Sequence, residues 1–559
     1  MSELTSLPKL PVMRMRRHPL LIGAVALIVA VMVLPFISLL ILAGTSDASD
    51  IADLFTTVLP SSLMTTVQLM LIVGVLTSSI GVVSAYLIIT YEFPFRRTLS
   101  WMLVLPVAVP AYIASYCFVD FLTFAGPVQT ALRWLMGFKT HGDYWFPDIR
   151  SVWGAGFIIA SVLYPYVYLT SRVVFLMQGR NAADVARSLG ASRARVFFQV
   201  LLPMARPAIA AGVALALMET LNDIGAVEYL GVKTLTFSIY NTWLGRGSLG
   251  GAAQLAVIML VLVLALLWVE SYARRQLRFN AGRASHIMAT TSRQRLEGLH
   301  AWAAMAACVM PIIIGFGIPF FVLLRFAVKR LDQLASPEFH AALATSIYVG
   351  CVTAIVTVAL SLFLLHVGRM MVLNRWHLLV KLATSGYAMP GTVLGLGLLF
   401  ALTTVDGWLN DMSRGLGGVP LGLVLSGSAF AVILAATIRF MAVAGSTLSS
   451  ALHKLPPNLD HAARNLGRTP WNASHTIMLP LLRPAIQTGL VLVFVDTIKE
   501  LSATILLRPL GFNTLATLVY ENASRAAVAD GSVAALAIVA TSLAPVLILS
   551  RSLAADRHG

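Results

Sequence analysis

The segment Asp184–Pro203, DVARSLGASRARVFFQVLLP, occurs a second time in the chain in altered form. The second copy, His461–Pro480, reads HAARNLGRTPWNASHTIMLP, and each of its residues lies 277 positions after its counterpart. Both copies have a glycine six positions after the start, Gly190 and Gly467, and both end on an aliphatic-x-Leu-Pro sequence. A fixed period shared by two segments indicates a duplicated unit. The sequence therefore predicts two repeats.

The composition predicts a membrane protein. Of the 559 residues, 58% are hydrophobic and only 11% are charged, whereas about a quarter of the residues of a soluble domain are charged. Apolar runs of 18 residues or more, long enough to cross a bilayer, recur along the chain. We predict an all-α, polytopic fold with about twelve transmembrane helices, near 20–43, 62–90, 99–123, 151–177, 207–230, 251–271, 300–324, 343–367, 378–402, 420–444, 484–507 and 532–550.

The net charge of +16 is interpreted as a signal of topology. Lys and Arg gather in alternate loops, as the positive-inside rule expects for loops on the cytoplasmic side. This pattern predicts no nucleic-acid partner, and it predicts that both chain termini are cytoplasmic. The segments assigned to the cytoplasm are Lys9–Arg17, Arg96–Arg97, the two repeated loops and Arg274–Arg295, whereas Asp47, Asp50 and Asp53 mark an outer loop.

The duplication extends beyond the repeated loop. The second predicted span of each repeat opens with a Thr-Thr or Thr-Ser pair (Thr65–Thr66, Thr345–Ser346), and the third has a matched proline, Pro110 or Pro390. Since six spans precede the polar linker, the repeats are expected to be parallel, related by an axis along the membrane normal. The predicted segments are an N-terminal cytoplasmic segment at 1–19, a first repeat at 20–273, a cytoplasmic linker at 274–298, a second repeat at 299–550 and a tail at 551–559.

The repeated loop is expected to form a rigid projection on the cytoplasmic face. Small residues on a short helix, such as Ala186, let another surface approach closely. The glycine that follows permits a sharp turn out of that helix. The Leu-Pro pair then ends the segment, and Pro207 and Pro484 suit the first turn of the next span.

The repeated pattern resembles the coupling-loop motif of ABC importer permeases, Glu-Ala-Ala-x3-Gly-x9-Ile-x-Leu-Pro, and the whole chain resembles two such permeases fused end to end. The resemblance implies the type I ABC importer permease fold, with each loop docked on one of two cytoplasmic ATPase subunits. The usual Glu-Ala-Ala is replaced by Asp184-Val185-Ala186 and His461-Ala462-Ala463. The coupling residues that it implies are Asp184, Ala186, Gly190, Leu202 and Pro203 in the first copy and Ala462, Ala463, Gly467, Leu479 and Pro480 in the second.

No Gly-x4-Gly-Lys-Ser/Thr loop occurs in the sequence, so nothing in this chain is expected to cradle nucleotide phosphates. ATP and Mg²⁺ are expected to bind to the partner ATPase subunits, with no cofactor and no catalytic residue in this chain. The chain is also predicted to contact the lipid bilayer.

Two pairs of acids follow the repeated loops at the same 277-residue spacing, Glu219 with Asp223 and Asp496 with Glu500. Within a pair the acids are four positions apart, so we expect them to share one helix face. The first acid of each pair is expected on the order of 20 Å into its span. Ionisable groups at that depth face a bundle interior or a watery pathway.

Two interpretations of these acids stay open. In the first, they pair with Lys499, the only cation among these acids, and with polar neighbours to hold the bundle together. Alternatively, they form a loose ring that eases a cation through, since hard cations prefer oxygen ligands. No stable metal site is expected, because a carrier must release its cargo.

The segments that contain these acids, Glu219–Trp243 and Asp496–Ala523, resemble those of fused ferric-ion permeases of bacterial inner membranes. That resemblance implies a periplasmic binding protein that delivers Fe(III). Fused permeases for thiamine and 2-aminoethylphosphonate share much of the pattern. A proton-coupled secondary transporter would explain the buried acids but not two matched cytoplasmic loops. A membrane-embedded enzyme would need a nucleophile–base or metal constellation, and the sequence offers none.

Overall fold

The computed structural model describes residues 19–45, 54–176, 180–275, 294–370, 376–453, 455, 472 and 474–555. In these ranges, eleven helices are long and apolar enough to cross a membrane. The twelfth predicted span corresponds to α25 (Ser532–Ala555), whose described apolar portion, Ser532–Val546, is shorter. The predicted all-α polytopic membrane fold is confirmed.

The helices of the two repeats follow the same order along the chain. The first repeat contains α1 (Pro19–Gly44), α3 (Leu59–Thr90), α4 (Arg96–Met102), α5 (Ala111–Leu122), α6 (Pro127–Met136), α7 (Val152–Val174), α8 (Arg180–Ser188), α9 (Arg193–Val196), α10 (Leu202–Asn222), α11 (Ile224–Tyr229), α12 (Leu235–Leu244) and α13 (Leu249–Arg275). The second contains α14 (Gly298–Ile312), α15 (Ile318–Lys329), α16 (Pro337–Met370), α17 (Trp376–Ala383), α18 (Gly391–Gly415), α19 (Ala429–His453), α22 (Leu479–Ile498), α23 (Thr504–Leu507), α24 (Leu515–Ser524) and α25.

The repeats share their internal packing. In the first, α3, α7 and α10 pack against one another, and in the second α16, α19 and α22 do the same. A matched hydrogen bond then holds the start of a short helix in each repeat, α12 in the first and α24 in the second. Thr66 Oγ1 accepts from the Leu235 amide at 2.8 Å, and Ser346 Oγ accepts from the Leu515 amide at 2.7 Å. The Thr-Ser pairs noted in the sequence are therefore structural contacts of the duplicated unit.

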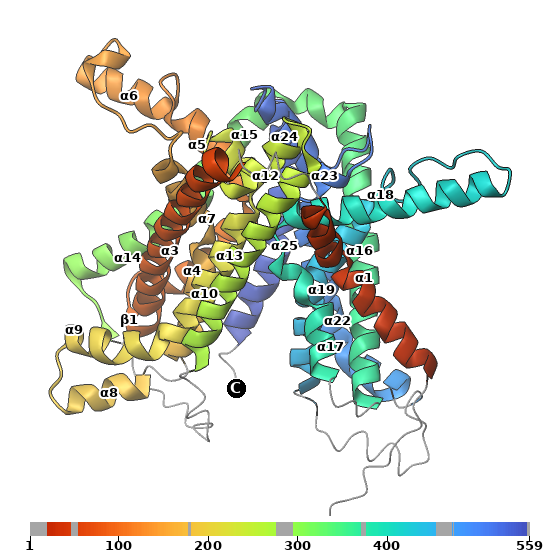
Figure 1. The fold of residues 1–559 in the computed structure, drawn as a ribbon. Helices are drawn as coiled ribbons and strands as arrows, with labels where there is room; N and C mark the ends of the chain where they lie inside the picture. Colours follow the sequence, from red (N-terminus) through yellow and green to blue (C-terminus); the bar gives the residue numbers. More distant parts are fainter. Residues whose placement is uncertain are drawn as a thin grey trace, which may run out of the picture.

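The first helix of each repeat packs against helices of the other repeat. Helix α1 packs along α18 and α17, whereas α14 packs on α3 and α4, and α15 packs on α5; Figure 1 shows α1 on the side of the second repeat and α14 on the side of the first. Glycines permit the close crossings, since small residues let helix backbones approach within membranes. A Cβ at Gly397 would lie 2.4 Å from the Pro35 carbonyl oxygen, and a Cβ at Gly315 would lie 2.1 Å from that of Ser161.

Two of the predicted spans in each repeat are broken, so the prediction of continuous helices there was wrong. The spans predicted at 99–123 and 378–402 are interrupted by a 3₁₀ turn, Leu105–Ala108 or Ser385–Ala388, before Pro110 or Pro390. Proline lacks an amide hydrogen and its ring clashes with the preceding turn of a helix. The spans predicted at 207–230 and 484–507 break where α10 and α22 end.

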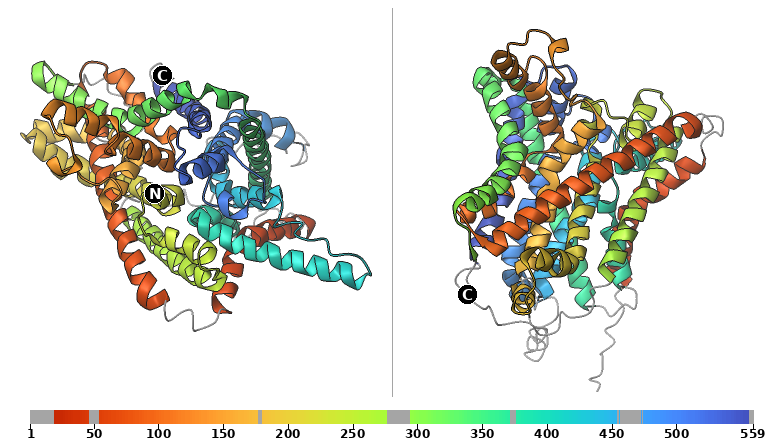
Figure 2. Two further views of the ribbon diagram at one scale, coloured as in Figure 1. Left: turned by 90° about the horizontal axis from the view of Figure 1, so that it is seen from above. Right: turned by 90° about the vertical axis from the view of Figure 1, so that its left-hand side faces the viewer.

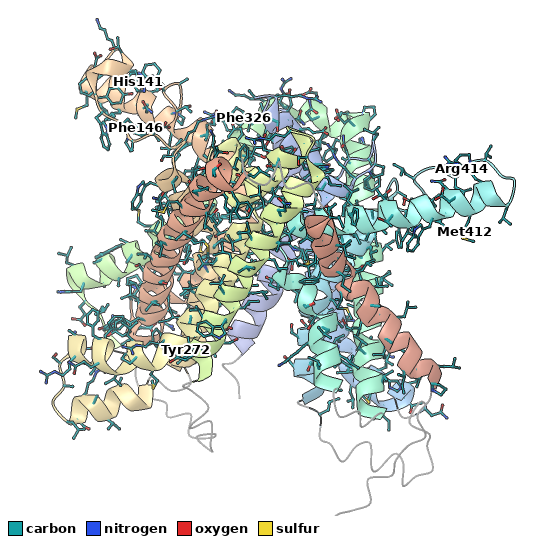
Figure 3. All side chains as sticks on the ribbon, in the orientation of Figure 1. His141, Phe146, Tyr272, Phe326, Met412 and Arg414 are labelled. Atoms are coloured by element: carbon teal, nitrogen blue, oxygen red, sulfur yellow. The ribbon has the colours of Figure 1, made fainter. Side chains whose placement is uncertain are left out.

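Different helices lie toward the two ends of the bundle. Helices α8 and α9 lie at one end, at the lower left of Figure 1. At the opposite end, the α6 region and the tip of α18 project beyond the bundle, and α18 extends sideways when the molecule is seen from above (Figure 2). Figure 3 shows the side chains of these two projections, His141 and Phe146 on one and Met412 and Arg414 on the other.

Part of the predicted linker is ordered against the first repeat. Helix α13 ends at Arg275, and the short strand β2 (Gln294–Arg295) pairs in parallel with β1 (Tyr91–Glu92) directly after α3. Most of the 274–298 segment lies outside the described residues, as do 1–18 and 556–559. The proposed domain limits thus remain predictions.

Candidate functional site

A cavity of about 110 Å³ lies between the two repeats, and all four predicted carboxylates line it. Its walls come from the start of α5 and from α7 and α10 in the first repeat, and from α19 and the end of α22 in the second. The structure therefore brings together acids that are 277 residues apart in sequence. The four acids have two different structural settings in this cavity.

Asp223 and Glu500 stabilise the backbone at the points where their spans are interrupted. Helix α10 ends at Asn222, and the Asp223 side chain then accepts a 2.8 Å hydrogen bond from the Ala226 amide at the start of α11. The Glu500 carboxylate likewise accepts from the Ala503 and Thr504 amides at 2.8 and 3.0 Å, before α23. Such capping satisfies amides that a helix start leaves unpaired. The expectation that each acid pair shares one helix face was wrong, because the helix ends before the second acid.

Glu219 and Asp496 lie one turn earlier and reach the open part of the cavity. Their side chains are 29% and 27% exposed, against 5% for that of Glu500. Glu219 Oε1 accepts a 3.2 Å hydrogen bond from the Tyr387 hydroxyl, and Asp496 Oδ1 lies 2.8 Å from Lys499 Nζ. The pairing of one acid with Lys499 is thus present, as the structural interpretation expects. Within the described residues, no group of three His, Cys, Asp or Glu side chains could hold a metal ion.

The sequence analysis missed Arg439, which lies in the middle of α19 and whose side chain is 7% exposed. Its Nη1 lies 3.5 Å from Glu500 Oε1, and its Nη2 lies 3.9 Å from Glu219 Oε2. Lys499 is therefore not the only cation among these acids. The signal was available, since a single arginine within an apolar span marks a functional or paired position.

Asn222 was also missed, although it is the contact point of the two repeats at the cavity. Its side-chain oxygen accepts from the Gly391 amide at 2.6 Å and from Arg439 Nη1 at 2.5 Å. Its main-chain carbonyl accepts a 2.5 Å hydrogen bond from the Ser502 hydroxyl. All three donors belong to the second repeat. No sequence pattern distinguishes this asparagine, because its importance comes from the tertiary contact.

The first repeated loop has the predicted helix–turn–return form. Helix α8 carries Asp184 and Ala186, and Gly190 follows it with a φ of +83°. The Ala191 amide bonds back to the Ala186 carbonyl at 3.0 Å, which closes the turn. Left-handed backbone of this kind is the usual end of a helix and favours glycine. The predicted glycine turn is confirmed for this copy.

The Leu-Pro pairs begin the next helices instead of ending the loop. Helix α10 starts at Leu202 with Pro203 in its first turn, and α22 starts at Leu479 with Pro480 in its first turn. Pro207 and Pro484, expected in the first turn, lie inside these helices. The remaining predicted residues of the second loop, Ala462, Ala463 and Gly467, lie outside the described residues.

The first loop exposes large apolar side chains. Val185 is 60% exposed, Leu189 82% and Phe198 63%. Val185 lies on α8, Leu189 directly follows it and Phe198 lies in the segment that leads into α10, so all three lie toward the end of the bundle where α8 projects (Figure 1). Exposed apolar side chains gathered on one projection indicate an interaction surface.

Comparison with known proteins agrees with this architecture. Residues 77–279 and 370–556 both match the family described as binding-protein-dependent transport system inner membrane component. The chain is 24% identical over 498 residues to the Fe(3+)-transport system permease protein FbpB 2 of Haemophilus influenzae, which covers 88% of this chain and 89% of that protein.

Shorter relatives match one part of the chain. The molybdenum transport system permease protein ModB of Escherichia coli is 26% identical over 211 residues, covering 36% of this chain and 88% of ModB. The putative 2-aminoethylphosphonate transport system permease protein PhnV of Salmonella typhimurium is 28% identical over 164 residues, 29% of this chain and 56% of PhnV. Because the family match occurs twice and covers most of the sequence, this chain belongs to the family of inner membrane components of binding-protein-dependent transport systems.

Proposed function

We propose that this chain is the translocation pathway of an ATP-driven importer whose cargo is ferric iron. The observation that carries the proposal is the charge balance of the central cavity, where four carboxylates face two cations, Arg439 and Lys499. A hard, multiply charged cation prefers such oxygen ligands. The relative that spans nearly the whole chain is a ferric-ion permease by name, which supports the same cargo.

Of the four acids, Glu219 and Asp496 are the pathway residues of this proposal. They occupy equivalent positions in the two repeats and reach the open cavity. Asp223 and Glu500 are already engaged by main-chain amides, so their carboxylates shape the site and add negative charge. Two loosely held carboxylates suit a carrier, which must bind its cargo weakly enough to release it.

The partners in this proposal are two copies of a cytoplasmic ATPase subunit and one periplasmic binding protein. The exposed Val185 and Leu189 support an ATPase contact at the first loop, because they need an apolar partner surface. The projections near α6 and the tip of α18 lie in the half of the molecule away from α8 and suit the binding protein (Figure 1). In this arrangement the chain sits in the bacterial inner membrane with both termini in the cytoplasm.

The mechanism is alternating access. ATP closes the two ATPase subunits, and the rigid turn at Gly190 transmits their movement to α10 without bending. Helix α10 ends at the cavity, so its displacement moves Glu219 directly. The two repeats then open to the outside, accept the cargo and return inward after hydrolysis. Broken helices at the midpoint of a span are common where transporters bind their cargo.

One observation favours a second candidate. Arg439 and Lys499 provide two cations in the cavity, and guanidinium and ammonium groups bind oxyanions well. Relatives of this chain include permeases named for molybdenum and 2-aminoethylphosphonate. An oxyanion cargo is therefore the alternative that the experiment must separate from ferric iron.

The test is ATP hydrolysis by the chain reconstituted in liposomes with its ATPase subunits and binding protein. The binding protein is added empty, or loaded in turn with Fe(III), 2-aminoethylphosphonate, molybdate or thiamine. Stimulation by the iron-loaded form alone supports the proposal. Stimulation by any other loaded form overturns ferric iron, and hydrolysis that no loaded form stimulates overturns the ATP-driven mechanism.

A further inference from the structure

The two cations of the cavity both come from the second repeat. In the first repeat, the positions 277 residues earlier hold Val162 in place of Arg439 and Asn222 in place of Lys499, and both of these residues also line the cavity. The pathway is thus symmetric in Glu219 and Asp496 but asymmetric in its counter-charges. Because the first repeat has no cation at these positions, we expect the cations of the second repeat to act on residues of the first.

Arg439 crosses the boundary between the repeats. Its guanidinium donates to Asn222 Oδ1 at 2.5 Å and approaches Glu219 within 3.9 Å, and both residues belong to α10 of the first repeat. From its own repeat it approaches Glu500 within 3.5 Å. One buried side chain therefore ties the end of α10 to α19 at the cavity wall.

We propose that Arg439 is a charge-selective latch: it holds the empty pathway closed, and a multiply charged cation that binds Glu219 displaces it. The selectivity part rests on the proposed cation transport, whereas the closing part does not depend on the cargo. The latch adds to the proposed function a reason why an empty or wrongly loaded complex stays shut.

Coulomb's law gives the latch its selectivity. At equal distance and dielectric constant, a trivalent cation attracts the Glu219 carboxylate three times as strongly as the single charge of a guanidinium. A monovalent cation has no such advantage over Arg439, which is already tethered beside the carboxylate. Once a trivalent ion occupies Glu219, it also repels the guanidinium, and at the cavity the hydrogen bonds of Asn222 with Gly391 and Ser502 then remain between the repeats.

The latch is incompletely satisfied, as a displaceable contact should be. Among the described residues, the buried Nε of Arg439 has no hydrogen-bond partner. A buried donor without a partner is costly, so the closed state gives up part of the stabilisation that the guanidinium could provide. Movement of Arg439 into a wetter, open cavity recovers that hydration.

The test compares Arg439→Gln with Arg439→Lys in the full reconstituted complex. The control variant is Arg325→Gln, because Arg325 and Asp120 form another ion pair between the repeats, at 2.6 Å and outside the cavity. ATP hydrolysis is measured with empty and with iron-loaded binding protein. Hydrogen exchange of the peptide that contains the Gly391 amide, a donor to Asn222, reports on the latch itself. Entry of Mn²⁺ into dye-loaded liposomes reports on leakage.

If the latch exists, Arg439→Gln raises hydrolysis with the empty binding protein by roughly 5-fold or more, the lower end of typical coupling between sites. It also speeds exchange at Gly391 and admits Mn²⁺, whereas Arg439→Lys and Arg325→Gln stay close to the unsubstituted protein. Should Arg439→Gln fail to assemble, Asn222→Ala removes the acceptor from the other repeat and must give the same increases.

Unchanged basal hydrolysis in both Arg439→Gln and Asn222→Ala, together with unchanged exchange at Gly391 in Arg439→Gln, overturns the latch. The proposed cargo fails separately, if the unsubstituted complex does not respond to iron-loaded binding protein. In that case a raised basal rate in Arg439→Gln still supports the closing role of Arg439, and the charge selectivity is rejected together with the cargo.

Discussion

The Tyr520 hydroxyl donates a 2.5 Å hydrogen bond to Oε2 of Glu228 and so joins α24 of the second repeat to α11 of the first. The Tyr240 hydroxyl lies 3.4 Å from that of Tyr520 and extends the contact into α12. Glu228 does not line the central cavity, so this contact is separate from the Asn222 contact. The repeats are therefore joined by a polar contact beside the cavity as well as by the contact at Asn222.

Tyr520→Phe should lower the stability of the protein because it leaves the half-buried Glu228 carboxylate without this donor. Hydrogen bonds to charged groups contribute about 1.5–3 kcal/mol. Thermal unfolding in detergent measures the loss for Tyr520→Phe, for Glu228→Gln and for the double variant. A coupling energy near zero in that cycle would show that the hydrogen bond does not hold the repeats together.

The four cavity acids should respond differently to neutralisation. Glu219→Gln with Asp496→Asn removes both pathway carboxylates, and we expect cation uptake to fall at least about tenfold, equivalent to 1.4 kcal/mol, with little loss of stability. Uptake by liposomes and the unfolding midpoint are measured together. Unchanged uptake in the double variant would remove the acids from the pathway.

Asp223→Ala serves as the matched comparison within the same cavity. It removes the carboxylate that caps α11, and loss of such a cap costs about 0.5–2 kcal/mol. We therefore expect a lower unfolding midpoint for Asp223→Ala and a smaller effect on uptake per folded molecule. Equal effects of Asp223→Ala and Glu219→Gln on both measurements would contradict the division of roles described above.

The sequence predicted the elements that depend on local pattern. The two repeats, the apolar spans and the turn at Gly190 follow from spacing, hydropathy and the freedom of glycine, and the structure has all three. The four acids were found because their type is rare in a membrane span. They were assigned to continuous helices, however, because periodicity does not reveal that α10 ends at Asn222.

What the sequence did not predict depends on contacts between the repeats. The hydrogen-bond and ion-pair partners of Arg439 lie on other elements, so its role appears only when α10 lies against α19. Asn222 is an ordinary residue by composition, and three donors from the other repeat make it important. The exchange of α1 and α14 between repeats is likewise invisible to periodicity, because either arrangement buries the same apolar residues.

Gly190→Ala should weaken coupling at the first loop. A side chain at a φ of +83° costs about 1–2 kcal/mol, so the turn between α8 and α9 should loosen. The measurement is the ATP hydrolysis of the reconstituted complex that loaded binding protein stimulates. Gly511→Ala is the control, since Gly511 has a φ of +77°, also has nothing within 4 Å of an added Cβ and lies outside the loop. Comparable losses of stimulation in both variants would show that backbone strain, not the loop, is responsible.

Gly397→Ala should test whether α1 is held by the second repeat. The added Cβ would lie 2.4 Å from the Pro35 carbonyl oxygen, a main-chain atom that cannot rotate away. The same crossing is closed by the Ser38 hydroxyl, which donates to the Gly397 carbonyl at 2.5 Å. Overpacking of this kind costs about 1–3 kcal/mol, so the unfolding midpoint should fall.

The control for this variant lies on the same helix. Gly407 also belongs to α18, but nothing lies within 4 Å of a Cβ built there. Because alanine favours a helix over glycine by about 1 kcal/mol, Gly407→Ala should leave the unfolding midpoint unchanged or raise it. The two substitutions are chemically identical, so opposite signs isolate the crossing with Pro35. A stable Gly397→Ala protein would mean that α1 does not pack on α18, and the exchange of first helices between the repeats would have to be abandoned.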